Sequence, residues 1–99
     1  MEVRKAVNQQ EVTLTLVGMI NTQSAPDFSN ELMAAVEEYS KIVLDFMELI
    51  YISSAGLRVI LQAVNAGEDQ SKEIGIIHAN DEIKEVFEMT GFSDFITVT

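Results

Sequence analysis

The clearest pattern in the chain is an alternation of apolar and polar side chains between residues 12 and 16. Val12, Leu14 and Leu16 alternate with threonines, which is the period of a half-buried β-strand rich in β-branched residues. We expect Gly18 to end this strand. Residues 3–7 alternate more weakly and predict a short edge strand. Further strands are predicted at 42–44, which should be buried on both faces, at 74–77, and at 96–98, as a short strand or extended tail.

Between these strands, apolar residues recur at steps of three and four, which is the helical period. A first helix is predicted from about Pro26, which suits a first turn, to Tyr39. We expect residues 45–51 to connect strand 42–44 to a second helix, which begins near Ser53 and ends at Gly67. A third helix is predicted between residues 80 and 91, with Asn80 or Asp81 as its cap. The inward-facing residues are predicted to be Phe28, Leu32, Ala35 and Val36 in the first helix, Leu57, Ile60, Leu61 and Val64 in the second, and Ile83, Val86 and Phe87 in the third.

The resulting order alternates strands with helices after an initial strand pair. Such an order predicts an α/β fold: a mixed β-sheet with helices packed mainly on one face, joined by right-handed crossovers. No linker or repeat divides the sequence, so we expect residues 1–99 to form one domain.

Charge and composition narrow the possible functions. The chain has sixteen acidic against six basic residues, a net charge of −10, and no cysteine. This balance disfavours binding to nucleic acids and to anionic membranes, and it suits either ordinary solubility or a partner with a basic face. No run approaches the roughly 20 apolar residues of a membrane span, and no signal peptide is evident, so we expect a cytoplasmic protein. Disulfides and cysteine-based zinc sites are excluded.

The segment with the most chemical interest is the serine pair at the predicted start of the second helix. Unpaired backbone amides and the positive end of the helix dipole favour a phosphate at this position. Ser54, Arg58, Gln62 and Asn65 share a polar stripe, and Arg58 lies one turn beyond Ser54, within reach of a phosphate on it. Gly56 is expected to leave the first turn open to another protein's backbone. On local physics alone, however, serine as a helix cap is the favoured interpretation.

Four apolar side chains precede this segment: Met47, Leu49, Ile50 and Tyr51. We expect at least two of them to belong to the core. Any that are exposed would form an apolar patch beside the serines and add to affinity for a partner.

Two enzymatic or signalling alternatives fit the sequence poorly. A serine hydrolase would place glycine at position 52, where the chain has Ile52, and would need the only histidine, His78, as its base. A response-regulator receiver could use Asp45, which follows a strand, but residues 17–20 lack the acidic pair that would hold magnesium. We therefore predict a protein that is not an enzyme and that uses no metal or cofactor of its own.

Four segments together resemble the anti-sigma factor antagonists and related STAS domains. Residues 42–46 (Ile-Val-Leu-Asp-Phe) and 51–58 (Tyr-Ile-Ser-Ser-Ala-Gly-Leu-Arg) resemble the family's buried strand, loop and serine motif. Residues 18–21 (Gly-Met-Ile-Asn) resemble its Gly-x-(Leu/Ile)-Asp element, and residues 88–95 resemble its late hydroxyl-Gly-aromatic turn. The likeness extends over nearly the whole chain, and it implies a STAS-like fold.

The resemblance also implies a switching function. In the family, an anti-sigma factor that is also a serine kinase holds a sigma factor inactive, and the unmodified antagonist binds this kinase and frees the sigma factor. Phosphorylation of the antagonist's serine releases it, and a phosphatase resets it. Carried over by position, the acceptor is Ser54. We expect a monomer or a weak dimer, a choice that the sequence leaves open. The partner-binding residues would be Asn21, Ser53, Ser54, Gly56, Arg58 and Gln62.

The chain departs from the family pattern at three of these positions. Ser53 and Asn21 stand where many members have Asp, and Arg58 stands where classical members often have Gly. The loss of a carboxylate beside the acceptor affects recognition by a kinase, and Arg58 would either obstruct docking or hold a phosphate. Two alternatives therefore stay open: phosphorylation at Ser53, and a STAS interaction module that is not phosphorylated, such as a scaffold or a transport-complex subunit.

Overall fold

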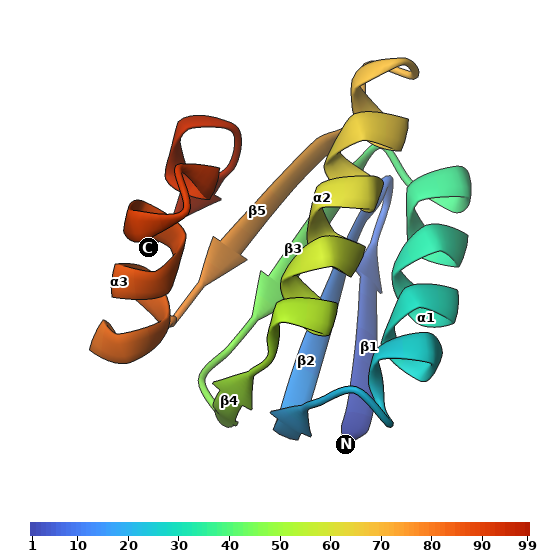
Figure 1. Ribbon diagram of the computed structural model, residues 1–99. Coiled ribbons are helices and arrows are strands. Elements are labelled where there is room, and N and C mark those ends of the chain that lie inside the picture. Colours follow the sequence, from blue (N-terminus) through green and yellow to red (C-terminus); the bar gives the residue numbers. More distant parts are fainter.

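The computed structural model of the protein describes all 99 residues, and its centre is a six-stranded mixed sheet (Figure 1). The sheet has the order β1-β2-β3-β5-β6, with β4 paired to β2; β1 is antiparallel to β2, and the other pairs are parallel. The strands are β1 (Glu2–Asn8), β2 (Glu11–Ile20), β3 (Lys41–Asp45), β4 (Leu49–Ile52), β5 (Glu73–Ile77) and β6 (Thr97–Val98). The helices are α1 (Ala25–Glu38), α2 (Ser54–Glu68) and α3 (Asp81–Met89), followed by the short 3-10 helix η1 (Phe92–Asp94).

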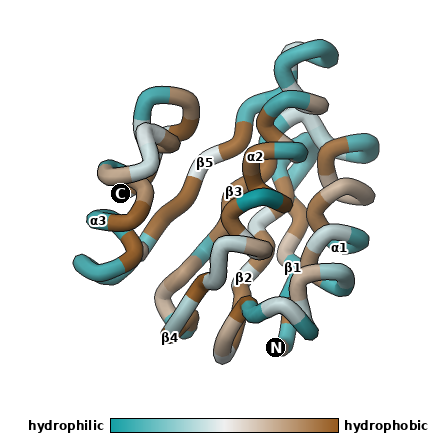
Figure 2. The backbone as a smooth tube through the Cα atoms, in the orientation of Figure 1, coloured by the Kyte–Doolittle hydropathy of each residue, from teal (hydrophilic) through white to brown (hydrophobic).

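The predicted α/β architecture, with helices mainly on one face, is confirmed. Figure 1 shows α1 and α2 side by side over one face of the sheet and α3 beyond β5. Figure 2 shows hydrophobic colouring on β2, β3 and β5 and on parts of α1 and α2. The core forms where inward residues of the strands meet the apolar stripes of the helices. Its fully buried large side chains include Leu14, Leu16, Phe28, Leu32, Ile42, Leu44, Phe46, Ile60, Ile76 and Phe87.

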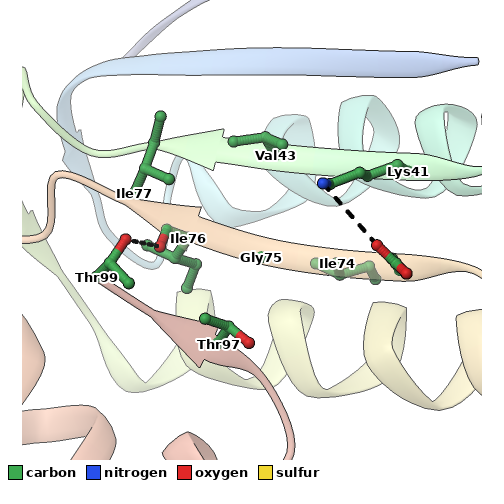
Figure 3. Close-up of a pocket in the computed structure, with 9 residues that line it drawn as sticks. Lys41, Val43, Ile74, Gly75, Ile76, Ile77, Thr97 and Thr99 are labelled. Carbon is green, nitrogen blue, oxygen red and sulfur yellow. Dashed lines mark hydrogen bonds and ion pairs between the residues drawn. The ribbon is translucent and has the colours of Figure 1, made fainter.

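Strand β3 differs from its prediction because the second face of the sheet carries no helix. Ile42 and Leu44 are buried under the helices, whereas Val43, on the opposite face, is only half-buried. On that open face, the missing side chain of Gly75 contributes to a shallow hollow of about 250 Å³, bordered by Val43, Ile77 and Thr97 (Figure 3). The expectation of a strand buried on both faces was therefore wrong.

Strand β4 was not predicted, because residues 45–51 were expected to be a simple connection. Instead, β2 continues past Gly18 to Ile20, with Gly18 at φ +99°, and its two halves pair with different strands. The first half of β2 pairs with β3, and residues 18–20 pair with β4. Strand β3 therefore ends before Phe46, and the chain pairs with β2 again from Leu49, as β4. This pairing makes the residues just before α2 part of the sheet.

The helix boundaries follow their predicted signals with one exception. The side chain of Asn80 caps α3 by accepting a hydrogen bond from the Ile83 amide at 2.8 Å, and Gly91 follows the helix with φ +79°. Helix α2 does not end at Gly67 but runs one residue further, to Glu68. No helix is long and apolar enough to span a membrane.

Candidate functional site

The two serines at the start of α2 have different environments. Ser53 is the N-cap: it is 9% exposed, and its Oγ accepts a hydrogen bond from the Gly56 amide at 3.3 Å. Its own amide donates to the Ile20 carbonyl at 2.8 Å, which ties the cap to the end of β2. Ser54, the first residue of the helix, is exposed, and its hydroxyl makes no hydrogen bond within the chain. The capping role therefore falls to Ser53, and the Ser54 hydroxyl is free.

The first turn of α2 offers an uncompensated positive end. The first intrahelical hydrogen bond joins the Leu57 amide to the Ser53 carbonyl, so the amides of Ser54 and Ala55 precede it. The first turn contains no acidic residue, although the chain has sixteen. Partial positive charge at this end of a 15-residue helix is therefore not balanced by a carboxylate of the helix itself.

The predicted polar stripe on α2 is confirmed, because Ser54, Arg58, Gln62 and Asn65 are all exposed. Arg58 makes no ion pair and no hydrogen bond. Beside the stripe, Arg58 and Gln62 border an open hollow of about 270 Å³ between α2 and the start of α1. The far side of the hollow is formed by Thr22, Ala25, Pro26 and Ser29.

The buried face of α2 is rotated slightly from the prediction. Leu57 and Ile60 are buried as expected, but Leu61 and Val64 are only half-buried. Val59 and Ala63 are buried in their place. The complete buried set is Gly56, Leu57, Val59, Ile60, Ala63 and Gly67.

Gly56 has a packing role that contradicts its predicted role at the partner surface. It is buried, and a Cβ at this position would lie 2.7 Å from Cγ2 of Ile20 and 2.8 Å from Cγ1 of Ile52. Glycine is therefore needed so that the first turn of α2 can approach β2 and β4. Gly56 faces the interior of the protein, and the expectation that it admits a partner's backbone was wrong.

Asn21 lies beside the site, but its side-chain oxygen is used locally. Its Oδ1 accepts hydrogen bonds from the amides of Gln23 (3.0 Å) and Ser24 (2.9 Å), which shapes the turn into α1. The backbone is close to the serines because the preceding residue, Ile20, pairs with Ile52. Asn21 was predicted to bind a partner. In the structure, its side-chain oxygen stabilises the turn before α1.

The apolar side chains before α2 are more exposed than predicted. Of the four, only Leu49 is buried, whereas Met47, Ile50 and Tyr51 are exposed. The expectation that at least two are core was therefore wrong. Met19, which was not predicted to belong here, is exposed and lies opposite Tyr51 in the register of β2 and β4. Only the pairing of these strands, which was not predicted, brings Met19 to this place.

The residues considered for catalysis form a separate pair. Nδ1 of His78 lies 2.9 Å from Oδ1 of Asp45, which also accepts a hydrogen bond from the Met47 amide at 3.0 Å. No hydrogen bond joins His78 to Ser54. The structure contains no group of three or more His, Cys, Asp or Glu side chains placed to hold a metal ion.

Comparison with known proteins places this geometry in a family. Residues 3–98 match the family model described as "Mlab, STAS domain". The BtrV protein of Bordetella bronchiseptica, named as an anti-sigma factor antagonist, is 36% identical over 84 residues, which cover 84% of this chain and 72% of BtrV.

Solved structures show the same fold at lower identity. An anti-sigma factor antagonist structure from Thermotoga maritima superposes with a TM-score of 0.90 at 17% identity, covering 97% of this chain and 84% of that one. The phosphorylated form of the Bacillus cell fate determinant SpoIIAA superposes with a TM-score of 0.79 at 15% identity, covering 99% and 91%. The chain belongs to the STAS domain family and is related to the anti-sigma factor antagonists within it.

Proposed function

We propose that the protein is an anti-sigma factor antagonist whose binding to an anti-sigma factor is switched off by phosphorylation of Ser54. The observation that carries the proposal is the free, exposed hydroxyl of Ser54 in the first turn of α2. The relationship to BtrV and to the other proteins named anti-sigma factor antagonists supports the same role. The partner would be an anti-sigma factor with serine kinase activity, acting in the cytoplasm, where ATP is available.

The modification itself needs only access to Ser54. The kinase would transfer the γ-phosphoryl group of ATP to Oγ of Ser54; the hydroxyl proton passes to a base of the kinase, and ADP leaves. The protein contributes an acceptor and no catalytic group. Ser53 is the less suitable acceptor, because its oxygen is buried and accepts the capping hydrogen bond from Gly56.

The phosphorylated product is compatible with the fold. A phosphoserine adds about −1.5 to −2 charges near neutral pH. At Ser54 this charge meets the free amides of the first turn and lies one turn from Arg58, a cation without another partner in the structure. The fold can therefore accept the phosphate while its surface changes strongly.

The same charge would prevent binding of the partner. The proposed contact surface is the exposed stripe of α2, with Ser54, Arg58 and Gln62 at its centre. Binding would then require the phosphate to lose its water against the partner, which costs free energy, so the partner would dissociate. Gly56 would contribute by positioning the helix and Ser53 by capping it, whereas Asn21 would offer its amide nitrogen. A phosphatase would restore the unmodified surface by hydrolysis of the phosphoserine.

Mass spectrometry after incubation with ATP and the purified kinase of the source organism tests the proposal. We expect the wild-type protein and Ser53→Ala to gain one phosphate, and Ser54→Ala to gain none. Ser53→Ala is the matched control, because it removes a hydroxyl one residue away. A phosphate on Ser53, or none on the wild type while the kinase phosphorylates another substrate, would contradict the proposal.

A second candidate is a STAS interaction module that binds its partner without being phosphorylated, as a scaffold or transport-complex subunit. The description of the matching family model as "Mlab, STAS domain", and Ser53 where many antagonists have Asp, favour this alternative. The two candidates differ in one measurement. A module would bind its partner with equal affinity as wild type, Ser54→Ala and Ser54→Asp, whereas a switch would lose affinity only with Asp.

A further inference from the structure

Three exposed apolar side chains lie together at the end of the sheet next to α2. Met19 from β2 and Ile50 and Tyr51 from β4 are 47%, 71% and 51% exposed. Met19 and Tyr51 are register partners, and Met19 and Ile50 border the same hollow. We call these three residues the β2–β4 ridge. Met47, in the loop before β4, is also exposed.

A β-bulge produces this exposure. The register passes from Gly18 opposite Leu49 to Met19 opposite Tyr51, so Ile50 has no residue opposite it. In a regular strand, successive side chains point to opposite faces, and one of Ile50 and Tyr51 would be turned inward. The extra residue breaks this alternation, and both side chains reach solvent, whereas Leu49 and Ile52 on either side are buried. Bulges commonly re-aim side chains in this way beside functional sites.

The ridge is bordered by acidic residues on two sides. One hollow at Ile50 is completed by Asp81 and Glu82 at the start of α3, and the hollow shared with Met19 includes Asp27 at the start of α1. Arg4 of β1 is already paired with Glu2 at 2.7 Å and with Glu48 at 3.2 Å. An exposed apolar ridge with acidic borders fits a protein surface that has apolar side chains flanked by lysine or arginine. A second copy of the chain is a poor occupant, because it would bring equally acidic borders together.

The ridge is continuous with the switch serine. Strand β4 ends at Ile52, directly before the cap Ser53, and the Ser53 amide is bound to the Ile20 carbonyl at the end of the β2 segment that carries Met19. We propose that the β2–β4 ridge is a second docking surface for the partner that recognises Ser54. The ridge binds an apolar segment of that partner that is flanked by basic residues. The identity of the partner rests on the proposed function, whereas the apolar, acid-bordered character of the surface does not.

Substitution of the ridge separates its role from that of Ser54. The double variant Ile50→Ser/Tyr51→Ser removes both bulge side chains. The matched control Met89→Ser/Phe95→Ser removes two somewhat more exposed apolar side chains from the region of α3 and η1. Circular dichroism melting checks that each variant is folded. Calorimetry then measures Kd for the purified anti-sigma factor kinase of the source organism, and kinetics with ATP measure kcat and KM for phosphorylation of Ser54.

We expect the ridge variant to raise Kd and KM at least tenfold with kcat unchanged, and the control to change neither. The charge-reversing variant Asp81→Lys/Glu82→Lys should also raise Kd, because it repels the basic flank. Unchanged Kd in the folded ridge variant would overturn the inference, and it would leave the proposed function intact if Ser54 is still phosphorylated. Weaker binding by the ridge variant to a partner that never phosphorylates Ser54 would support the ridge and contradict the switch. A ridge-dependent dimer in sedimentation, with no effect on the partner, would assign the surface to a second copy and overturn the inference.

Discussion

Helices α2 and α3 begin in the same way but differ in charge. Each follows a strand of the parallel part of the sheet, and each is capped by a side-chain oxygen that accepts from the amide three residues on: Ser53 from Gly56, and Asn80 from Ile83. The first turn of α3 carries Asp81 and Glu82, whereas the first turn of α2 has no acidic residue. Helix α1 also has an acid, Asp27, in its first turn.

The difference shows what is special about the start of α2. In a chain with a net charge of −10, a carboxylate in the first turn of a helix is the expected arrangement, because it stabilises the positive end of the dipole. Only α2 lacks this compensation, and only α2 has a free serine hydroxyl there. The positive end of α3 is therefore balanced by its own carboxylates, whereas the positive end of α2 is not.

The largest expected effect is on partner binding when a permanent charge is placed at the start of α2. Ser54→Asp should weaken binding to the kinase by about 2–5 kcal/mol, because the carboxylate would be desolvated against the partner. Ser54→Ala should bind as the wild type does and remain unphosphorylated. Calorimetric titration of the three proteins measures the difference. Gln70→Glu adds a carboxylate after the far end of α2 and should leave the affinity unchanged. If this variant lost as much affinity as Ser54→Asp, the net charge of the protein, and not the position of the charge, would explain the loss.

The next largest effect is on stability, because α2 packs more closely against the rest of the protein at its start than at its end. Gly56→Ala should lower the free energy of unfolding by about 1–3 kcal/mol, since the new methyl group would overlap Ile20 and Ile52. Gly67→Ala is the matched control: its nearest contact is the Lys72 Cβ at 3.3 Å, and alanine favours the helix by about 1 kcal/mol. Urea denaturation compares the variants, and equal stabilities would show that Gly56 is not required by the β2–β4 contact.

The sequence was sufficient for the features that depend on local chemistry. The caps, Pro26 in α1, the alternation in β2 and the glycine after α3 all have signals within a few residues. The order of the elements followed from the hydrophobic periodicity, and the family resemblance agreed with it. The serine pair shows the limit of this approach. Either hydroxyl could cap the helix, and the choice of Ser53 depends on the phase of α2, which burial of Gly56 against β2 and β4 determines.

The features that were missed all depend on contacts between distant segments. Strand β4 is only four residues long, and all four of its residues are apolar, so the sequence shows no alternation there. Its bulge gives the burial pattern buried, exposed, exposed, buried, which is not the period of a strand. Met19 could not be assigned to the site for the same reason. The open face of the sheet is likewise a property of the whole fold, because three helices in sequence do not reveal that none of them covers Val43.

The two caps themselves should differ in strength. Asn80→Ala should cost about 1 kcal/mol, because water can replace the lost acceptor at this exposed position. Ser53→Ala should cost somewhat more, about 1–2 kcal/mol, since it leaves the buried Gly56 amide without a partner. Thermal unfolding of both variants provides the comparison. A larger loss for Asn80→Ala would mean that water reaches the Gly56 amide and that the start of α2 is less closed than the contacts indicate.

The smallest expected effect is on stability, through the interaction of a charge with the helix dipole. In the absence of a partner, Ser54→Asp should stabilise the protein by about 0.3–1 kcal/mol, because it supplies the carboxylate that α2 lacks, and Asp81→Ser should destabilise it by a similar amount. Both changes should shrink as salt is raised, since salt screens the interaction of an exposed charge with the helix dipole, and the screening length falls to about 3 Å at 1 M ionic strength. Urea denaturation at low and high salt measures them. Opposite signs for the two variants would confirm that the helix starts differ in charge compensation, and a destabilising Ser54→Asp would contradict an anion site at α2.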